Sequence, residues 1–135
     1  RDGKDYLVVV GTLHLVGPKE LLRARAAVRT VQLSDALKDY IVNLVFATRD
    51  PEAYRLGTIG PLIAYGASPR ATIYLAMAAR ARAFLAGRAF VIPDDVKDVA
   101  LDVMRHRIIV TYEAEAEEVT PEEVIGQVLR TVEVP

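Results

Sequence analysis

Apolar residues recur at helical spacing in several segments of this chain. The clearest stripe follows the i, i+3, i+4, i+7, i+8 pattern and consists of Leu37, Tyr40, Ile41, Leu44 and Val45. This spacing places all of them on one face of a helix. Similar stripes predict helices near 18–29, 34–48, 69–86, 93–104 and 121–132. Helices of this length depend on packing, so we expect each one to bury its apolar face.

The segment 69–86 is rich in alanine and carries its larger apolar side chains near one face. These side chains are Ile73, Met77 and Phe84, and we expect that face to be the buried one. Gly87 follows the segment and provides a C-terminal stop.

Four of the predicted helices begin next to a proline, which suits the first helical turn because its missing N–H would have no partner there. Their starts are Gly17-Pro18, Ser68-Pro69, Ile92-Pro93 and Thr120-Pro121. Three of the starts carry an acidic residue in the first turn, but Ser68-Pro69 is followed by Arg70. A cation at a helix N-terminus is unfavourable by roughly 0.3–1 kcal/mol. Free N–H groups and a guanidinium there can bind phosphate, although Arg70 could also reach solvent or pair with a nearby acid.

Strand signals are few. The β-branched run Ile108 to Val110 is one candidate strand, and Val31 to Leu33 is its candidate partner. The stretch from Thr48 to Gly66 is predicted to be an irregular loop. We therefore expect a mainly α-helical small bundle with at most a minor, short strand pair. Residues 18–135 form the predicted domain, and residues 1–17 are interpreted as a linker or an added, extended segment.

Composition excludes several kinds of site. The chain has 135 residues, of which 52% are hydrophobic and 26% charged, so it has the composition of one globular domain. It has no cysteine and two histidines, which argues against a metal site and against a cysteine nucleophile. Because the chain begins with Arg1 and shows no signal peptide, we expect a cytoplasmic piece of a longer protein.

Charge is distributed unevenly, although the net charge is only −1. Residues 1–112 carry 16 basic and 11 acidic groups, whereas residues 113–135 carry one basic and seven acidic groups. The acidic end is either a solvated surface or a docking surface for a basic partner. The nearly neutral net charge argues against nucleic-acid binding. No run of apolar residues is long enough to span a membrane.

Motifs for complete catalysis are missing from the chain. There is no GxxxxGK[ST], GxGxxG, GxSxG or HExxH pattern. Asp94 and Asp95 follow Pro93, which favours a role as helix N-terminal acids over paired catalytic carboxylates. We therefore expect no complete catalytic site within this chain.

Several motifs occur in order along the chain: VQLSDALKDYIVNLVFATRDP, GASPRA at residues 66–71, FVIPDDVKDVA, the RHRIIVTYEAEAE run and the closing VTPEEVI. Together they resemble the C-terminal lid of MoxR-type AAA+ ATPases. The resemblance covers residues 18–135. It implies a small helical lid, separated here from the P-loop, the magnesium-binding motif and the arginine finger of its core.

The resemblance also implies a function. Arg70 occupies the sensor 2 position, which reaches the γ-phosphate of ATP held by the core. The nucleotide-binding residues implied are Ser68, Pro69 and Arg70, with Tyr40 and Ile41 on an earlier helix, and no metal ligand. ATP and Mg would serve the full-length protein, with none bound tightly by this chain. The family forms homo-oligomeric rings, often hexameric, that act as chaperones in assembly or cofactor insertion, with clients that frequently contain von Willebrand A domains.

Two other functions remain open from the residues themselves. The chain could be a free-standing helical interaction module that uses its acidic region 113–135 or the loop 49–65. It could also bind nucleic acid weakly through its arginines.

Overall fold

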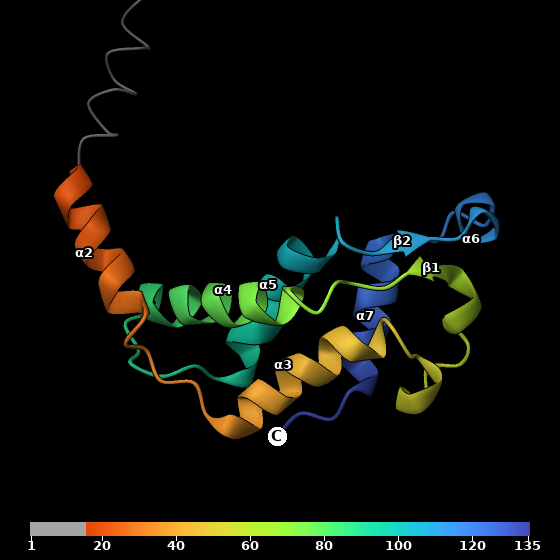
Figure 1. The fold of residues 1–135 in the computed structure, drawn as a ribbon, viewed down its shortest axis with the longest axis horizontal. Helices are drawn as coiled ribbons and strands as arrows, with labels where there is room; N and C mark the ends of the chain where they lie inside the picture. Colours follow the sequence, from red (N-terminus) through yellow and green to blue (C-terminus); the bar gives the residue numbers. More distant parts are fainter. Residues whose placement is uncertain (1–15) are drawn as a thin grey trace, which may run out of the picture.

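The computed structural model describes residues 16–135, so the interpretation of residues 1–17 falls almost entirely outside it. The elements run in the order α2 (Pro18–Val28), α3 (Asp35–Ala47), η1 (Glu52–Tyr54), η2 (Gly60–Leu62), β1 (Ile63–Tyr65), α4 (Ala71–Leu85), α5 (Pro93–Met104), β2 (Ile109–Val110), α6 (Tyr112–Ala116) and α7 (Pro121–Thr131) (Figure 1). The described part of the chain is therefore a small helical bundle with one minor sheet, as the sequence predicts.

All five helices expected from the sequence are present. The proline is the first helical residue in α2, α5 and α7. Helix α4 instead begins at Ala71, two residues after Pro69. The short helix α6 was not predicted, because five residues are too few to show a helical period.

The predicted strand pairing is wrong. Strand β2 pairs antiparallel with β1, with Ile63 opposite Val110, and not with Val31–Leu33. The segment near Val31 contacts the α4–α5 connection instead, through an isolated parallel bridge between Gln32 and Phe90. Short β-branched runs show strand tendency but not the partner, which depends on the path of the whole chain.

The expected buried face of α4 is also wrong. The buried residues of this helix are spaced four apart and are Ala71, Leu75, Ala79 and Ala83. Ile73 and Met77, which we expected inside, are 58% and 57% exposed. Small side chains let two helix backbones approach closely, and α4 packs mainly against α5. The alanines and Leu75 therefore form the inner face, Ile73 and Met77 remain outside, and Phe84 is partly buried against the core.

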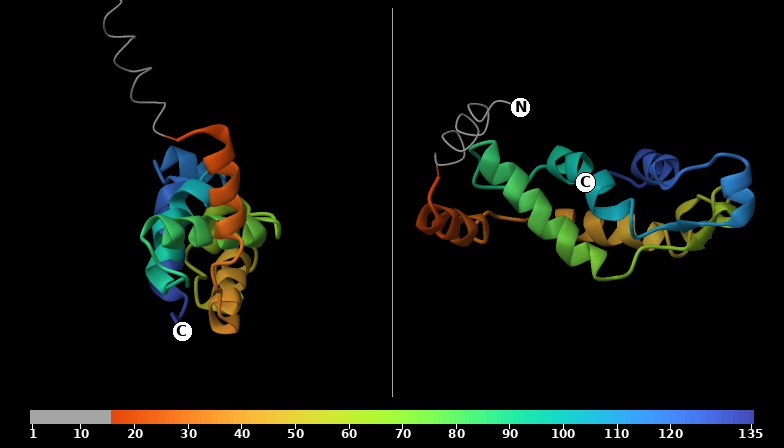
Figure 2. Two further views of the ribbon diagram at one scale, coloured as in Figure 1. Left: turned by 90° about the vertical axis from the view of Figure 1, so that its left-hand side faces the viewer. Right: turned by 90° about the horizontal axis from the view of Figure 1, so that it is seen from above.

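The molecule is elongated, with α2 at one end and the β1–β2 sheet and α6 at the other (Figures 1 and 2). Helix α2 buries none of its own residues, so its predicted stripe does not reach the core. Helices α3, α4, α5 and α7 surround the core between the two ends. Within residues 16–135, no helix is both long and apolar enough to cross a membrane.

Candidate functional site

The loop that carries Arg70 lies directly on the end of helix α3. Gly66 approaches the backbone of Thr48 so closely that an added Cβ would lie 2.2 Å from the Thr48 carbonyl oxygen. Real Cβ atoms do not approach that closely, so only glycine fits at this position without a backbone shift. The glycine of the GASPRA motif therefore fixes the loop against α3.

Two side chains after α3 hold the same loop. The buried Thr48 hydroxyl donates to the Val45 carbonyl at 2.7 Å and accepts the Ala67 N–H at 2.9 Å. The Arg49 guanidinium donates to the Ala67 carbonyl at 3.2 Å. Neither Thr48 nor Arg49 was predicted as a site residue from the sequence. The available signal was a hydroxyl and a cation directly after a strong helical stripe.

Arg70 is the N-cap of α4, with a helical backbone conformation and an exposed side chain. Its N–H donates to the Ser68 hydroxyl at 3.3 Å. The next N–H groups donate to the carbonyls of Ser68, Pro69 and Arg70. The expected set of free N–H groups is thus largely used within the turn, and the Arg70 side chain is left exposed beside it.

Among residues 16–135, no carboxylate pairs with Arg70. One turn further along α4, the Arg107 guanidinium stacks over the Tyr74 ring, 4.7 Å from its centroid. This contact joins the first turns of α4 to the segment after α5, and it contributes about 0.5–1 kcal/mol at exposed sites. The start of α4 is therefore braced by its neighbours while its own cation stays unpaired.

The structure separates the predicted nucleotide-binding residues into two groups. Ser68, Pro69 and Arg70 are exposed and adjacent. Tyr40 and Ile41 are each 2% exposed and belong to the core, so their side chains have little surface for a ligand. Burial and the nearby charge of Asp94 raise the pKa of Tyr40. Ile41 reaches the edge of a surface hollow that Thr72 and Ile73 also line.

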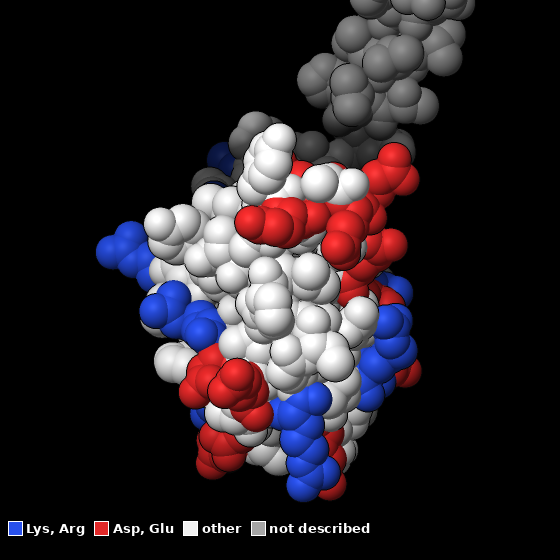
Figure 3. Space-filling view, turned by 90° about the vertical axis from the view of Figure 1, so that its right-hand side faces the viewer, with Lys and Arg blue, Asp and Glu red and all other residues white. Residues whose placement is uncertain are grey.

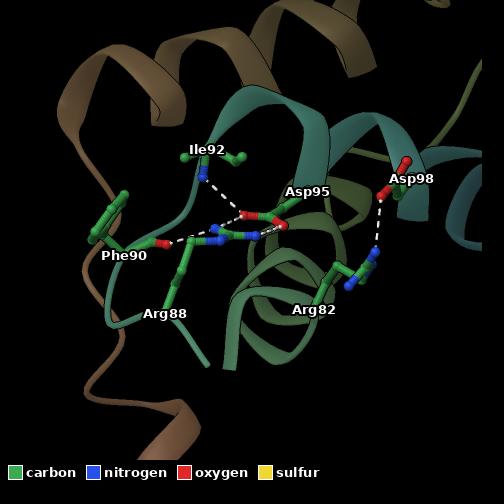
Figure 4. Close-up of polar contacts among 6 residues, drawn as sticks. All are labelled: Arg82, Arg88, Phe90, Ile92, Asp95 and Asp98. Carbon is green, nitrogen blue, oxygen red and sulfur yellow. Dashed lines mark hydrogen bonds and ion pairs between the residues drawn. The ribbon is translucent and has the colours of Figure 1, made fainter. Parts of the chain in front are cut away.

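The acids after Pro93 have a structural role. The Asp95 carboxylate is 2% exposed and accepts two hydrogen bonds from Arg88, at 2.7 and 2.5 Å, and one from the Ile92 N–H at 2.9 Å (Figure 4). The Arg88 guanidinium holds the pKa of Asp95 below its ordinary value. The clamp closes the turn between α4 and α5, which Gly87 begins with a φ of +76°.

Comparisons with known proteins agree with this architecture. Residues 58–128 match the family model described as the AAA lid domain. The chain belongs to this family. It is 46% identical over 116 residues to Chaperone MoxR1 of Mycobacterium tuberculosis, covering 86% of this chain and 31% of that protein. It is 40% identical over 108 residues to Protein MoxR of Paracoccus denitrificans, covering 76% of this chain and 32% of that protein.

A solved structure shows the same fold. A protein from Cytophaga hutchinsonii assigned as an ATPase matches with a TM-score of 0.84 and 44% identity, over 87% of this chain and 36% of that one. The chain is therefore the lid of a MoxR-type AAA+ ATPase. It spans about a third of the length of the curated relatives that it matches.

The lid's own residues can provide only part of an ATP site. It offers one exposed guanidinium at the α4 start, which suits a phosphate. Residues 16–135 contain no group of three or more His, Asp or Glu side chains placed to hold a metal ion. The residues thus fit contact with a phosphate and do not fit a magnesium site within the lid.

Proposed function

We propose that this lid senses ATP bound by the ATPase core and that Arg70 donates hydrogen bonds to the γ-phosphate. The observation that supports this role is an exposed guanidinium with no carboxylate partner in residues 16–135, at a helix start where a cation is unfavourable. Ser68 and Pro69 shape the turn that presents it. ATP with Mg supplies the reactive phosphoryl group, and Arg70 stabilises the charge on it.

The loop contacts give this arginine a way to move the lid. Gly66 touches the end of α3, and Ala67 is hydrogen-bonded to Thr48 and Arg49. When Arg70 binds the phosphate and its loop moves, α3 and α4 therefore move with the loop. Binding that favours the closed lid shifts the population toward closure, and loss of the γ-phosphate releases it.

The names of the relatives support a proposal for the larger assembly. We propose a homo-oligomeric ring in which ATP-driven lid movement supports chaperone work, either assembly or metal-cofactor insertion. A client with a von Willebrand A domain is the partner class that we favour. Three relatives that match this chain bear the name MoxR, and one of these is called a chaperone.

The test of the sensor role is Arg70→Ala in the protein that carries both this lid and its core. Arginines that stabilise phosphoryl-transfer charge contribute about 10³-fold or more, so we expect a fall in kcat of that order. Arg70→Lys should restore little of the lost kcat, because an ammonium group lacks the planar, two-pronged hydrogen-bonding geometry of the guanidinium. Normal hydrolysis by Arg70→Ala would refute the proposal.

The isolated chain provides the matching control. We expect no phosphate release from it, since it lacks the P-loop that cradles the nucleotide. Phosphate release that persists in Arg70→Ala identifies a contaminating ATPase. Turnover that Arg70→Ala abolishes would show catalysis within the lid itself and contradict this assignment.

A second candidate function is protein binding at the acidic end. Acidic side chains gather beside a broad uncharged area there (Figure 3). Tyr65, Ile109 and Tyr112 belong to this end and are 70%, 57% and 82% exposed. Aromatic side chains are enriched in binding surfaces. If a client docks here, Tyr112→Ala weakens capture of a von Willebrand A domain client in a pull-down and leaves ATP hydrolysis unchanged.

A further inference from the structure

The outward face of α4 continues from Arg70 along the whole helix. Arg70, Ile73, Met77 and Arg80 are spaced i, i+3, i+7, i+10, which is one helical face. Ile73 and Met77 are more than half exposed. Arg80 lies ten residues beyond Arg70, about 15 Å along the axis. The face that begins with the proposed phosphate contact is thus apolar in its middle and cationic at its far end.

Arg80 lies at the edge of a hollow between α3 and α4. The hollow has a volume of about 270 Å³, and its apolar lining includes Ile41, Val42, Ile73 and Ala76. The Arg80 Nε is buried and finds no hydrogen-bond partner within the described part of the chain. Arg80 also forms none of the ion pairs within residues 16–135, so the positive charge of its guanidinium is not compensated there. The other cation at the hollow, Lys38, already contacts Asp35 at 2.8 Å.

We propose that this hollow is a docking site for the ATPase core and that a core carboxylate pairs with Arg80. A carboxylate is the acceptor that a guanidinium prefers, and an apolar neighbour on the core would cover Ile73 and Met77. Arg70 and Arg80 lie on the same face of α4. If ATP held by the core reaches Arg70, the core lies against this face, so we take the core as the occupant of the hollow. The inference rests on the proposed function of Arg70 and adds a second anchor for the closed lid.

Carbodiimide coupling tests the contact directly, since it joins an amine to a carboxylate only when the two touch. In the protein with its core, Arg80→Lys places an amine at the hollow. We expect mass spectrometry to find position 80 linked to an Asp or Glu of the core, more strongly with a non-hydrolysable ATP analogue. The matched control is Arg82→Lys on the opposite side of α4, which should link to Asp98, since Arg82 and Asp98 lie 3.4 Å apart (Figure 4). Coupling at position 82 without any core link at position 80 would overturn the proposal.

Kinetics provide a second measurement that does not depend on the coupling. Arg80→Gln should raise the ATP concentration for half-maximal hydrolysis about 5-fold and leave kcat within about twofold, because it weakens closure without touching the phosphate. Arg82→Gln should change neither value. An unchanged KM in a folded Arg80→Gln protein contradicts the docking site.

The two proposals can fail separately. If Arg70→Ala hydrolyses ATP normally while position 80 still couples to the core, the sensor role is wrong and the docking site stands. If Arg70→Ala is inactive and position 80 couples to no core residue, the docking site alone is wrong.

Discussion

Helices α4 and α5 both have a proline at or just before their first turn, but the two turns are built in opposite ways. At α5, Asp95 is buried and satisfied by Arg88 and the Ile92 N–H. At α4, Arg70 is exposed and has no carboxylate partner within residues 16–135. The α5 start stabilises the fold, whereas the α4 start keeps an unfavourable charge exposed at the position that we propose contacts phosphate. A charged side chain that lacks a partner, in a protein whose comparable helix start is fully paired, is therefore a stronger indication of function than the charge by itself.

Removing the α5 clamp should cause the largest loss of stability. Asp95→Ala leaves the Arg88 guanidinium without its partner, and breaking a buried pair costs about 3–5 kcal/mol. The Arg88 side chain is 26% exposed, so water recovers part of this, and we expect about 2–3 kcal/mol. Urea unfolding of the chain measures the change. Asp98→Ala, which breaks an exposed pair with Arg82, should stay within about 0.5 kcal/mol. Equal losses in the two variants would contradict the assigned role of the clamp.

Distorting the loop at the α4 start should have the next largest effect. Gly66→Ala places a Cβ against the Thr48 backbone, and overpacking of this kind costs about 1–3 kcal/mol. Thermal unfolding, followed by circular dichroism, reports the loss. Gly57→Ala is the control, because no atom lies within 4 Å of its added Cβ. If Gly66→Ala is as stable as Gly57→Ala, the loop is not fixed against α3 as described.

Acid should weaken the α5 start selectively. The pKa of Asp95 lies below its ordinary value of 3.8 in the folded protein, through its hydrogen bonds with Arg88. The stabilisation is therefore present above pH 3.8 and is lost as the pH falls through the lower, folded-state pKa. Asp95→Asn cannot make this proton-linked contribution. Urea unfolding at several pH values should show the difference between wild type and Asp95→Asn shrinking toward acid pH. A constant difference would contradict this linkage.

The sequence predicted the helices well because each has a clear local signal. The stripe from Leu37 to Val45 is buried as expected. At the start of α7, Thr120 and Glu123 are three residues apart and form a capping box, with hydrogen bonds of 2.9 and 3.3 Å. The resemblance also located the loop at residues 66–70. These features depend on residues that are close in sequence, so local patterns describe them.

The failures concern choices made by tertiary packing. Hydrophobic size suggested that Ile73 and Met77 face inward, but close packing of α4 on α5 requires the alanine face. The partner of β2 depends on how the loop from Thr48 returns, which no local pattern shows. The anchoring role of Thr48 depends on a contact with Ala67, 19 residues away. These contacts join residues that are far apart in the sequence, so only the three-dimensional structure reveals them.

The smallest predicted effect gives the α4 start the acid that the other proline-led starts carry. Arg70→Glu exchanges an unfavourable helix-dipole contact for a favourable one, so the chain should gain about 0.5–1 kcal/mol of stability. Arg70→Ala should fall between wild type and Arg70→Glu, because it only removes the cation. Urea unfolding at low salt resolves the series, and added salt should shrink it. In the protein with its core, Arg70→Glu should be the least active of the three, since its carboxylate repels the phosphate. A less stable Arg70→Glu chain would show that Arg70 supports the fold, and the contrast between the two helix starts would fail.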